Sequence, residues 1–238
     1  SLGFNAENAN AKIIYVSPEP SGNGATINSP MSIDRAFSTA VAGDVVKIKG
    51  GNYGHVHLVV GNSGTTFESY DGTAYLDGVN HDGYGITVSG KTNVTIKGIK
   101  VKRYYCGIWF TNFSHKGKLE KVVADSCSKI GVGWEGIGIR IHKSDTCQLI
   151  NCSATDNGGE NISLLASNNC LIKDCGAYCE QTANPHDYIT DYYFVLIWSS
   201  NNTIINCYAE DKKASTKGNH GFIIKDQADP GGTNFKIP

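Results

Sequence analysis

Side chains that can move protons gather in four segments of the C-terminal half of the chain, each just before a short alternating run. These segments are residues 133–135, 156–160, 181–193 and 212–220. The longest contains His186, Asp187 and Asp191 among tyrosines. Loops on a rigid scaffold often carry reactive groups, so this composition is a stronger functional hint than a core position. We expect an active site where the segments meet; the alternative is solvated loops with no role.

Two kinds of bond cleavage fit these residue types. Elimination beside a substrate carboxylate needs a base to take the proton and a cation to stabilise the enolate. The candidates for these roles are Arg140, His142, His186, His220 and Lys225. Hydrolysis instead needs two carboxyl groups at a separation of roughly 5 to 9.5 Å. Glu160 with Asp187 or Asp191 could supply them.

An internal repeat indicates which elements position these residues. Residues 147–154, 170–177 and 203–209 match one another, and residues 96–101 and 119–124 match more loosely. A shared inward position recurs after 23, 30, 23 and 32 residues, at Ile99, Val122, Cys152, Cys175 and Cys207. Alternating runs that follow a glycine, such as 107–111 and 138–142, precede most of these positions. Short period-2 runs between Asn, Gly and Ser turns indicate strands.

A repeat of this length, with occasional insertions, fits a coil of three strands whose additional residues form loops. We therefore predict an all-β fold, a single-stranded right-handed parallel β-helix of about seven coils with three short strands in each. A propeller would need a longer repeat of four strands, and a sandwich would not repeat in sequence.

The N-terminal segment is predicted to cover one end of this stack. Residues 32–42 read as a short amphipathic helix, with Ser32 as N-cap and Gly43 at its end. An uncovered end would expose strand edges and core, so a cap is needed. We expect one domain over 1–238: strand and capping helix in 1–50, coils in 51–227, and a tail in 228–238. Truncation of the tail from a larger protein is an open alternative.

The opening of the chain also resembles a known superfamily. Residues 15–18 (Tyr-Val-Ser-Pro), 29–36 (Ser-Pro-Met-Ser-Ile-Asp-Arg-Ala) and 42–53 are similar to the start of pectate-lyase-like right-handed parallel β-helix proteins. The similarity continues through 66–72 and then as repeats to about Asp226. It implies the fold more than the chemistry, because the same scaffold carries lyases, glycoside hydrolases, epimerases and binding modules.

The resemblance implies that the groove lies on the outer face of the first strand of each coil. Alternation then places a set of apolar residues inward: Ile86, Ile108, Ile139, Ile162, Val195 and Phe222. One outward column is predicted as Thr87, Trp109, Arg140, Ser163, Leu196 and Ile223. The other is predicted as Ser89, Thr111, His142, Leu165, Trp198 and Lys225.

The polar and aromatic members of these columns and loops predict an extended acidic polysaccharide as ligand. Sugar rings stack on aromatic faces, and Arg and Lys pair with carboxylate or sulfate groups. The candidate substrate-binding residues are Trp109, Trp134, Glu135, Tyr192 and Trp198. The resemblance also implies calcium in a lyase, with oxygen ligands from Asp156, Glu160 and Asp187. The alternative is that these residues only decorate one sheet face.

A weaker resemblance concerns residues 191–221, which are similar to archaeal disaggregatase-type β-helix proteins. Those proteins dismantle a chondroitin-like cell envelope, and the resemblance implies an acidic polysaccharide as substrate class.

The eight cysteines follow the repeat, which favours a stack of free buried thiols, although one bridge between coils is possible. A zinc site made by Cys175 and Cys179 is not expected, because a second pair at metal spacing is absent from the sequence. His55 and His57 could bind a metal, but we interpret them as exposed edge-strand residues.

A formal net charge of −1 does not favour a nucleic-acid partner, and no apolar run is long enough for a membrane span. We expect a secreted or cell-surface enzyme acting on an acidic, uronate-containing polysaccharide, as a lyase or a glycoside hydrolase. The alternative is a non-catalytic carbohydrate-binding or cell-surface module of a larger protein. A trimeric tail-fibre segment is a third possibility, so monomer and trimer both remain open.

Overall fold

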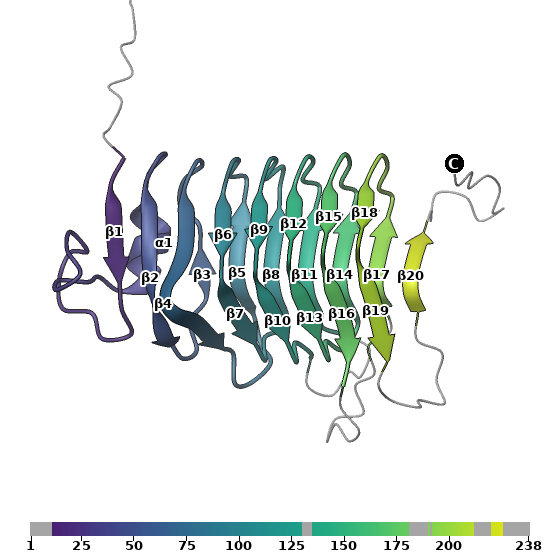
Figure 1. Ribbon diagram of the computed structural model, residues 1–238, viewed down its shortest axis with the longest axis horizontal. Helices are drawn as coiled ribbons and strands as arrows, with labels where there is room; N and C mark the ends of the chain where they lie inside the picture. The colour runs from purple at the N-terminus through teal and green to yellow at the C-terminus, as the bar shows by residue number, and fades with distance from the viewer. Residues whose placement is uncertain (1–10, 130–134, 181–189, 191, 212–219, 226–238) are drawn as a thin grey trace, which may run out of the picture.

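The computed structural model describes residues 11–129, 135–180, 190, 192–211 and 220–225, with the side chain of His220 excepted. Its strands stack into a parallel β-helix that runs from β1 to β20 (Figure 1). All the described strand pairs are parallel, from β1 with β2 to β17 with β20. The predicted all-β fold is therefore confirmed.

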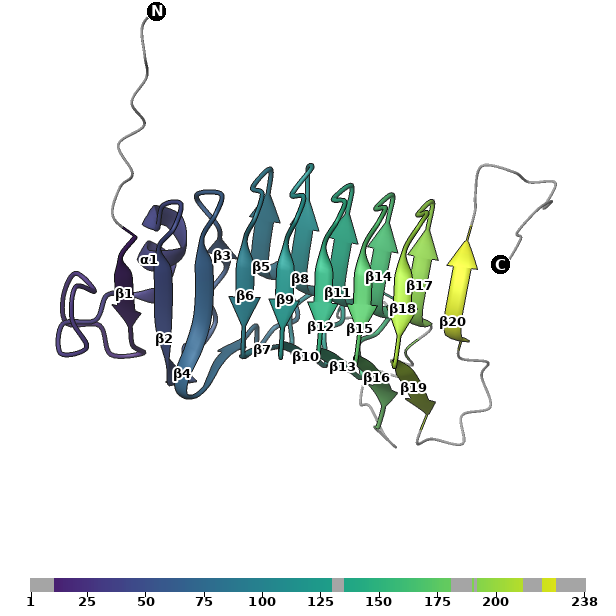
Figure 2. The ribbon, with the colours of Figure 1, turned by 45° about the horizontal axis from the view of Figure 1, so that its top comes forward.

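One face of the stack is a seven-stranded sheet. In order, its strands are β3 (Leu58–Val59), β5 (Tyr84–Ser89), β8 (Cys106–Thr111), β11 (Ile137–His142), β14 (Glu160–Leu165), β17 (Tyr192–Ile197) and β20 (His220–Lys225). These are the predicted first strands of the coils, and Figure 2 shows them behind the second strands.

The other two faces belong to a second sheet, which bends along the long strand β4 (Thr66–Asp77). The second strands are β6 (Thr95–Lys97), β9 (Lys118–Glu120), β12 (Gln148–Ile150), β15 (Leu171–Lys173) and β18 (Thr203–Ile205). The third strands are β7 (Ile99–Lys102), β10 (Val123–Asp125), β13 (Ser153–Thr155), β16 (Gly176–Cys179) and β19 (Tyr208–Asp211). Strands β1 (Ile13–Val16) and β2 (Val45–Asn52) begin the stack.

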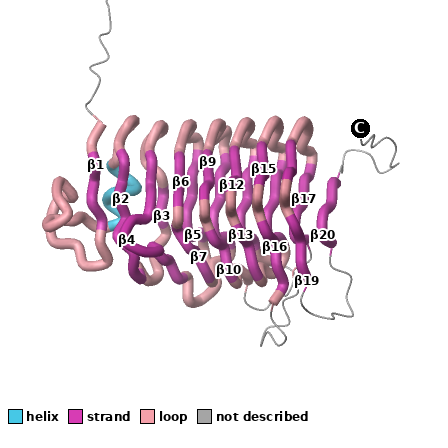
Figure 3. The backbone as a smooth tube through the Cα atoms, viewed as in Figure 1, coloured by secondary structure: helices cyan, strands magenta, loops and turns pink. Residues whose placement is uncertain are grey.

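The corner between second and third strands is made by one left-handed residue. Figure 3 shows the strands of the stack in magenta and the loops that join them in pink. Asn151, Asp174 and Asn206 have φ near +53°, a region that Asn and Asp tolerate better than most residues. The N–H of Asn151 donates to the carbonyl of Lys173 in the next coil at 3.0 Å. The Asn-Cys and Asp-Cys corners thus lie where the sequence predicts them.

The N-terminal end is covered by a helix that is shorter than predicted. Helix α1 (Ile33–Thr39) follows Ser32, which occupies the N-cap position without a side-chain capping hydrogen bond. Phe37 is fully buried, and its ring stacks on Phe67 with centroids 3.9 Å apart. At the opposite end, the inward side chains of β20 are about half exposed, at Phe222 and Ile224.

The inward column of the seven-stranded sheet differs from the prediction at β17. Phe194, and not Val195, pairs in register with Ile162 and Phe222 and continues the core. Leu196 consequently points inward, and Val195 takes the outward place. The segment is apolar at nearly every position, so alternation alone could not show which residues point inward. The register of β17 with β14 fixes which residues do.

Within the described ranges, no helix is long and apolar enough to cross a membrane.

Candidate functional site

A cleft of about 280 Å³ opens where the strands of the seven-stranded sheet begin. It is lined by Tyr105, Glu135, Gly136, Ile137, Arg140, Gly159, Glu160 and Tyr192. These residues come from the starts of β8, β11, β14 and β17, so four neighbouring coils contribute. Main-chain bonds align the coils: Gly136 accepts from Glu160 at 2.9 Å, and Gly159 accepts from Tyr192 at 2.9 Å.

Arg140 and Glu160 form the central charged pair of the cleft. An Nη2 of Arg140 lies 2.5 Å from Oε2 of Glu160, and Nε donates to Oγ of Ser163 at 3.2 Å. The two side chains are only 20% and 14% exposed. Arg140 pairs in register with Ser163, so it reaches back along the strand to meet Glu160. The guanidinium is thereby held in one orientation.

Glu135 and Tyr105 also line the cleft. Oε2 of Glu135 accepts from Nζ of Lys129 at 2.7 Å. Burial, reinforced by the nearby Glu135 carboxylate, raises the pKa of the Tyr105 hydroxyl. Tyr105 therefore keeps its proton at neutral pH and can donate it.

A buried amide network positions Glu160 at the start of β14, and sequence reasoning missed it. Asn157 and Asn161 are fully buried, and Nδ2 of Asn157 donates to Oδ1 of Asn161 at 2.7 Å. Asn157 also accepts from the N–H of Cys127 at 2.9 Å, and Asn161 donates to the carbonyl of Tyr178 at 3.1 Å. The network ties three coils together directly beside Glu160. In the sequence, these residues look like ordinary turn asparagines.

Three aromatic rings form a row along the outer face. Trp109 stacks on Tyr84 with centroids 4.7 Å apart and lies parallel to His142 at 6.3 Å. Nε1 of Trp109 is buried and has no hydrogen-bond partner among the described residues. Burial, followed by the charges of Lys143 and Arg140, lowers the pKa of His142. His142 is therefore neutral at pH 7 and can accept a proton.

Not every predicted residue reaches this face. Trp198 follows the end of β17 in a left-handed turn and is half exposed; Ile197 takes the predicted place beside Leu165 and Lys225. Lys225 lies over the ring of Tyr192, with Nζ 3.6 Å from the centroid. Ser163 and Val195 point outward but are fully buried. Trp134, His186, Asp187, Asp191 and the side chain of His220 lie outside the described residues.

The predicted calcium site stays a prediction, because one of its three carboxylates lies outside the described residues. Calcium prefers six to eight oxygen ligands, whereas Glu160 pairs with Arg140 and Oδ1 of Asp156 accepts from the N–H of Glu180 at 2.7 Å. Asp187 lies outside the described part of the chain. Calcium therefore enters no step derived below.

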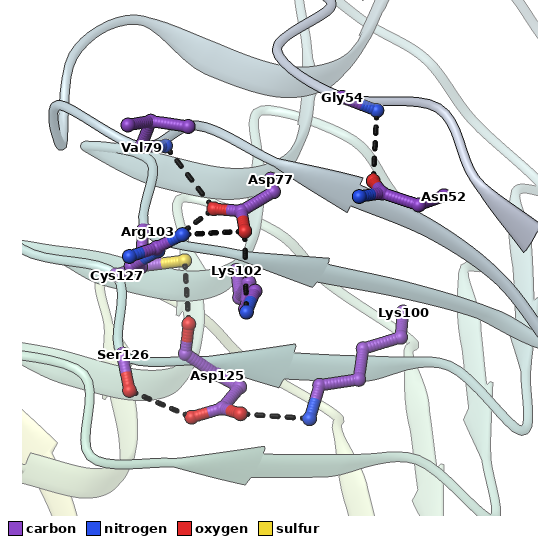
Figure 4. A network of polar contacts seen from close by, with 10 residues as sticks. All are labelled: Asn52, Gly54, Asp77, Val79, Lys100, Lys102, Arg103, Asp125, Ser126 and Cys127. Atoms are coloured by element: carbon purple, nitrogen blue, oxygen red, sulfur yellow. Dashed lines mark hydrogen bonds and ion pairs between the residues drawn. The ribbon is translucent and has the colours of Figure 1, made fainter.

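A second polar network lies at the ends of β4, β7 and β10 (Figure 4). Arg103 binds both carboxylate oxygens of Asp77, at 2.8 and 2.6 Å, and Nζ of Lys102 lies 3.1 Å from one of them. Asp77 also accepts from the N–H of Val79 at 3.2 Å. Because these polar groups form hydrogen bonds and ion pairs with one another, we interpret this network as structural.

Comparison with known proteins identifies similar folds among solved structures. No protein-family model and no curated protein sequence matches the chain. Among solved structures, pectate lyase Pel9A aligns with a TM-score of 0.68 and 18% identity, over 87% of this chain and 57% of that one. The Dettilon tailspike protein aligns with a TM-score of 0.53 and 12% identity, over 89% and 49%. The chain thus spans about half the length of each of these proteins.

The chain has the right-handed parallel β-helix fold that these solved structures share. At these identities the likeness concerns the fold, and the chemistry must be argued from the cleft.

Proposed function

We propose that the chain cleaves an acidic, uronate-containing polysaccharide on the outer face of its seven-stranded sheet. The observation that carries the proposal is the oriented Arg140 guanidinium in an open cleft, on the same strand and face as a neutral His142. A polysaccharide at the cell surface or outside the cell is the matching substrate, and we propose that location for the chain.

The row of rings supports a sugar as ligand. Tyr84 and Trp109 provide flat apolar surface, and the buried indole N–H of Trp109 lacks an acceptor in the described structure. A sugar hydroxyl could supply that acceptor, and an unmet buried donor is costly otherwise. Pectate lyase, whose chain shares this fold, acts on a polymer of the proposed kind.

Elimination is the reaction that these groups fit best. Arg140 would bind the uronate carboxylate and stabilise the charge that develops when the neighbouring C–H proton leaves. Neutral His142 would take that proton, the electron pair would form the new C=C bond, and the glycosidic C–O bond would break. Tyr105, which retains its proton, would protonate the departing oxygen.

Hydrolysis is the second candidate, because Glu135 and Glu160 line the same cleft. Two carboxyl groups facing one sugar could act as acid and base. In the described structure Glu135 is ion-paired to Lys129, and Glu160 is ion-paired to Arg140.

The test is incubation with a panel of uronate-containing polysaccharides, with calcium or with chelator, following both new reducing ends and the ultraviolet absorbance of the new double bond. Both signals together indicate elimination, and reducing ends alone indicate hydrolysis. Binding without cleavage would replace the proposal with a carbohydrate-binding module, and neither binding nor cleavage on any polymer would contradict it. Arg35→Ala, an exposed change on α1, is the control for Arg140→Ala.

A further inference from the structure

We infer that His55, His57 and Asp82 bind a divalent transition metal of the zinc type. The two histidines lie just before β3, and Asp82 lies in the turn before β5, so neighbouring coils bring them together. One ligand atom from each residue lies within 4.8 Å of the others. This is the one group of three or more such side chains found in the described ranges.

The spacing suits a small metal ion. Ligands about 2.0–2.2 Å from zinc in a tetrahedron lie roughly 3.3 Å from one another. Nε2 of His55 already lies 3.1 Å from Oδ1 of Asp82. The remaining separations close by rotation of exposed side chains; that of Asp82 is 61% exposed.

His57 is held as metal-binding histidines are held. Its Nδ1 lies 2.9 Å from the carbonyl oxygen of Tyr84, so Nδ1 carries the proton and Nε2 keeps a free lone pair. A Cβ on Gly83, whose φ is +58°, would lie 2.3 Å from the His57 ring. The ring is thus seated against a turn that requires glycine. This contact is independent of the clustering of the three ligands.

The backbone between the two histidines is also fixed. The hydroxyl of buried Tyr104 donates to the carbonyl of Val56 at 2.7 Å. The Tyr104 ring lies 6.1 Å from that of His55 and 5.8 Å from that of His57, centroid to centroid. Both imidazoles are therefore presented on one side of a rigid support.

The ligand types select the metal. Two imidazoles and one carboxylate suit zinc, nickel, copper or cobalt, whereas calcium and magnesium prefer oxygen ligands alone. Three protein ligands leave a fourth position for water or an incoming group. Our interpretation of His55 and His57 from the sequence, as exposed edge residues, omitted Asp82, which lies 25 residues beyond His57 and reaches the site only through the stacking of coils.

The site does not depend on the proposed enzyme activity, although it borders the row of rings. Tyr84 holds His57 through its carbonyl and stacks on Trp109 through its ring. A bound ion would join two coils near the N-terminal end and stabilise the folded state in proportion to its concentration.

The experiment is titration of the full chain with Zn²⁺ by calorimetry, paired with thermal unfolding. We expect one equivalent to bind and to raise Tm, and Asp82→Asn and His57→Gln each to weaken binding by about tenfold or more. His115→Gln, on another turn, is the matched control and should bind as the parent does. Co²⁺ in place of Zn²⁺ should give a spectrum without thiolate charge-transfer bands, which excludes the cysteines as ligands.

Asp82→Asn changes an exposed side chain, so it tests the site without risk to folding, and circular dichroism verifies His57→Gln. The inference is overturned if the parent binds no Zn²⁺, if binding is unchanged in both variants, or if Co²⁺ reports thiolate ligands.

Discussion

At the scale of single residues, Arg140 owes its orientation to Glu160 and Ser163. Placement on the outer face follows from strand alternation, but the contact with Glu160 comes from the next coil. Such a pair can serve either reaction: Glu160 positions the guanidinium in elimination and acts as an acid or base in hydrolysis. A double-mutant cycle separates the two roles.

If Glu160 only positions Arg140, we expect Arg140→Ala to lower kcat/KM by about 100-fold or more, and Glu160→Gln to lower it less. The double variant should then be no worse than Arg140→Ala alone, because the second change removes support for a group already lost. Steady-state kinetics on the polymer identified by the panel gives all three values. An additive loss would show that Glu160 acts on the substrate directly.

His142 gives a pH prediction. Burial first, then Lys143 and Arg140, lowers its pKa below the usual 6.5. A base works when neutral, so kcat/KM should be constant at higher pH and fall as pH falls through that lowered pKa. The midpoint of the acid limb should lie below 6.5.

Lys143→Gln removes one of the charges that lowers this pKa, so the midpoint should move upward. A pH–rate profile of parent and variant checks this. If the midpoint of the acid limb is unchanged in Lys143→Gln, or if the acid limb persists in His142→Ala, the titration belongs to another group.

At the scale of elements, the ends of the third strands depend on Asp77. Burial by itself would raise its pKa, but hydrogen bonds from Arg103, the Val79 N–H and Lys102 outweigh burial and lower the pKa to about 2. The stability that Asp77 contributes is therefore fully present above its usual pKa of 3.8 and is lost as pH falls toward 2.

Asp77→Asn should lower the free energy of unfolding at pH 7 by about 1–3 kcal/mol, because it removes the charge from a nearly buried acceptor that binds Arg103 and Lys102. Urea unfolding at pH 7 and at pH 3 measures the difference, which should shrink at the lower pH. Glu19→Gln, an exposed acidic position, is the control. An equal loss at both values would show that the charge of Asp77 contributes little.

At the scale of the whole molecule, stacked cysteines form part of the core. All eight are free, and seven are buried. The N–H of Cys152 donates to Sγ of Cys175 at 3.4 Å, and that of Cys175 to Sγ of Cys207 at 3.4 Å. Burial raises the pKa of Cys127 to about 12 and also raises that of Cys106, so neither forms the reactive thiolate at neutral pH.

We therefore expect slow reaction of the native protein with a thiol reagent, beginning at the half-buried Cys207, and eight reactive thiols after unfolding in denaturant. Absorbance of the released thiol counts them with and without prior reduction. Fewer than eight without reduction would reveal a disulfide between coils.

Local patterns in the sequence were enough to predict the stack of coils. The 23-residue spacing, the Asn-Cys corners and the period-2 runs each reflect a local requirement: a left-handed turn residue, a small inward side chain, or an alternating strand. These requirements act within one coil, so they can be read along the chain, and they correctly placed Arg140, His142 and Trp109 on the outer face of the seven-stranded sheet.

Features that depend on contacts between coils became visible only in the folded structure. Four features depend on residues from neighbouring coils. They are the inward-facing set of strand β17, the Arg140–Glu160 pair, the buried Asn157–Asn161 network and the His55–His57–Asp82 cluster. Their relative placement depends on register between strands and on the length of the intervening loops, and neither follows from local side-chain preference. Register is fixed only when the core packs, because a shift of one residue would exchange the two faces of a strand.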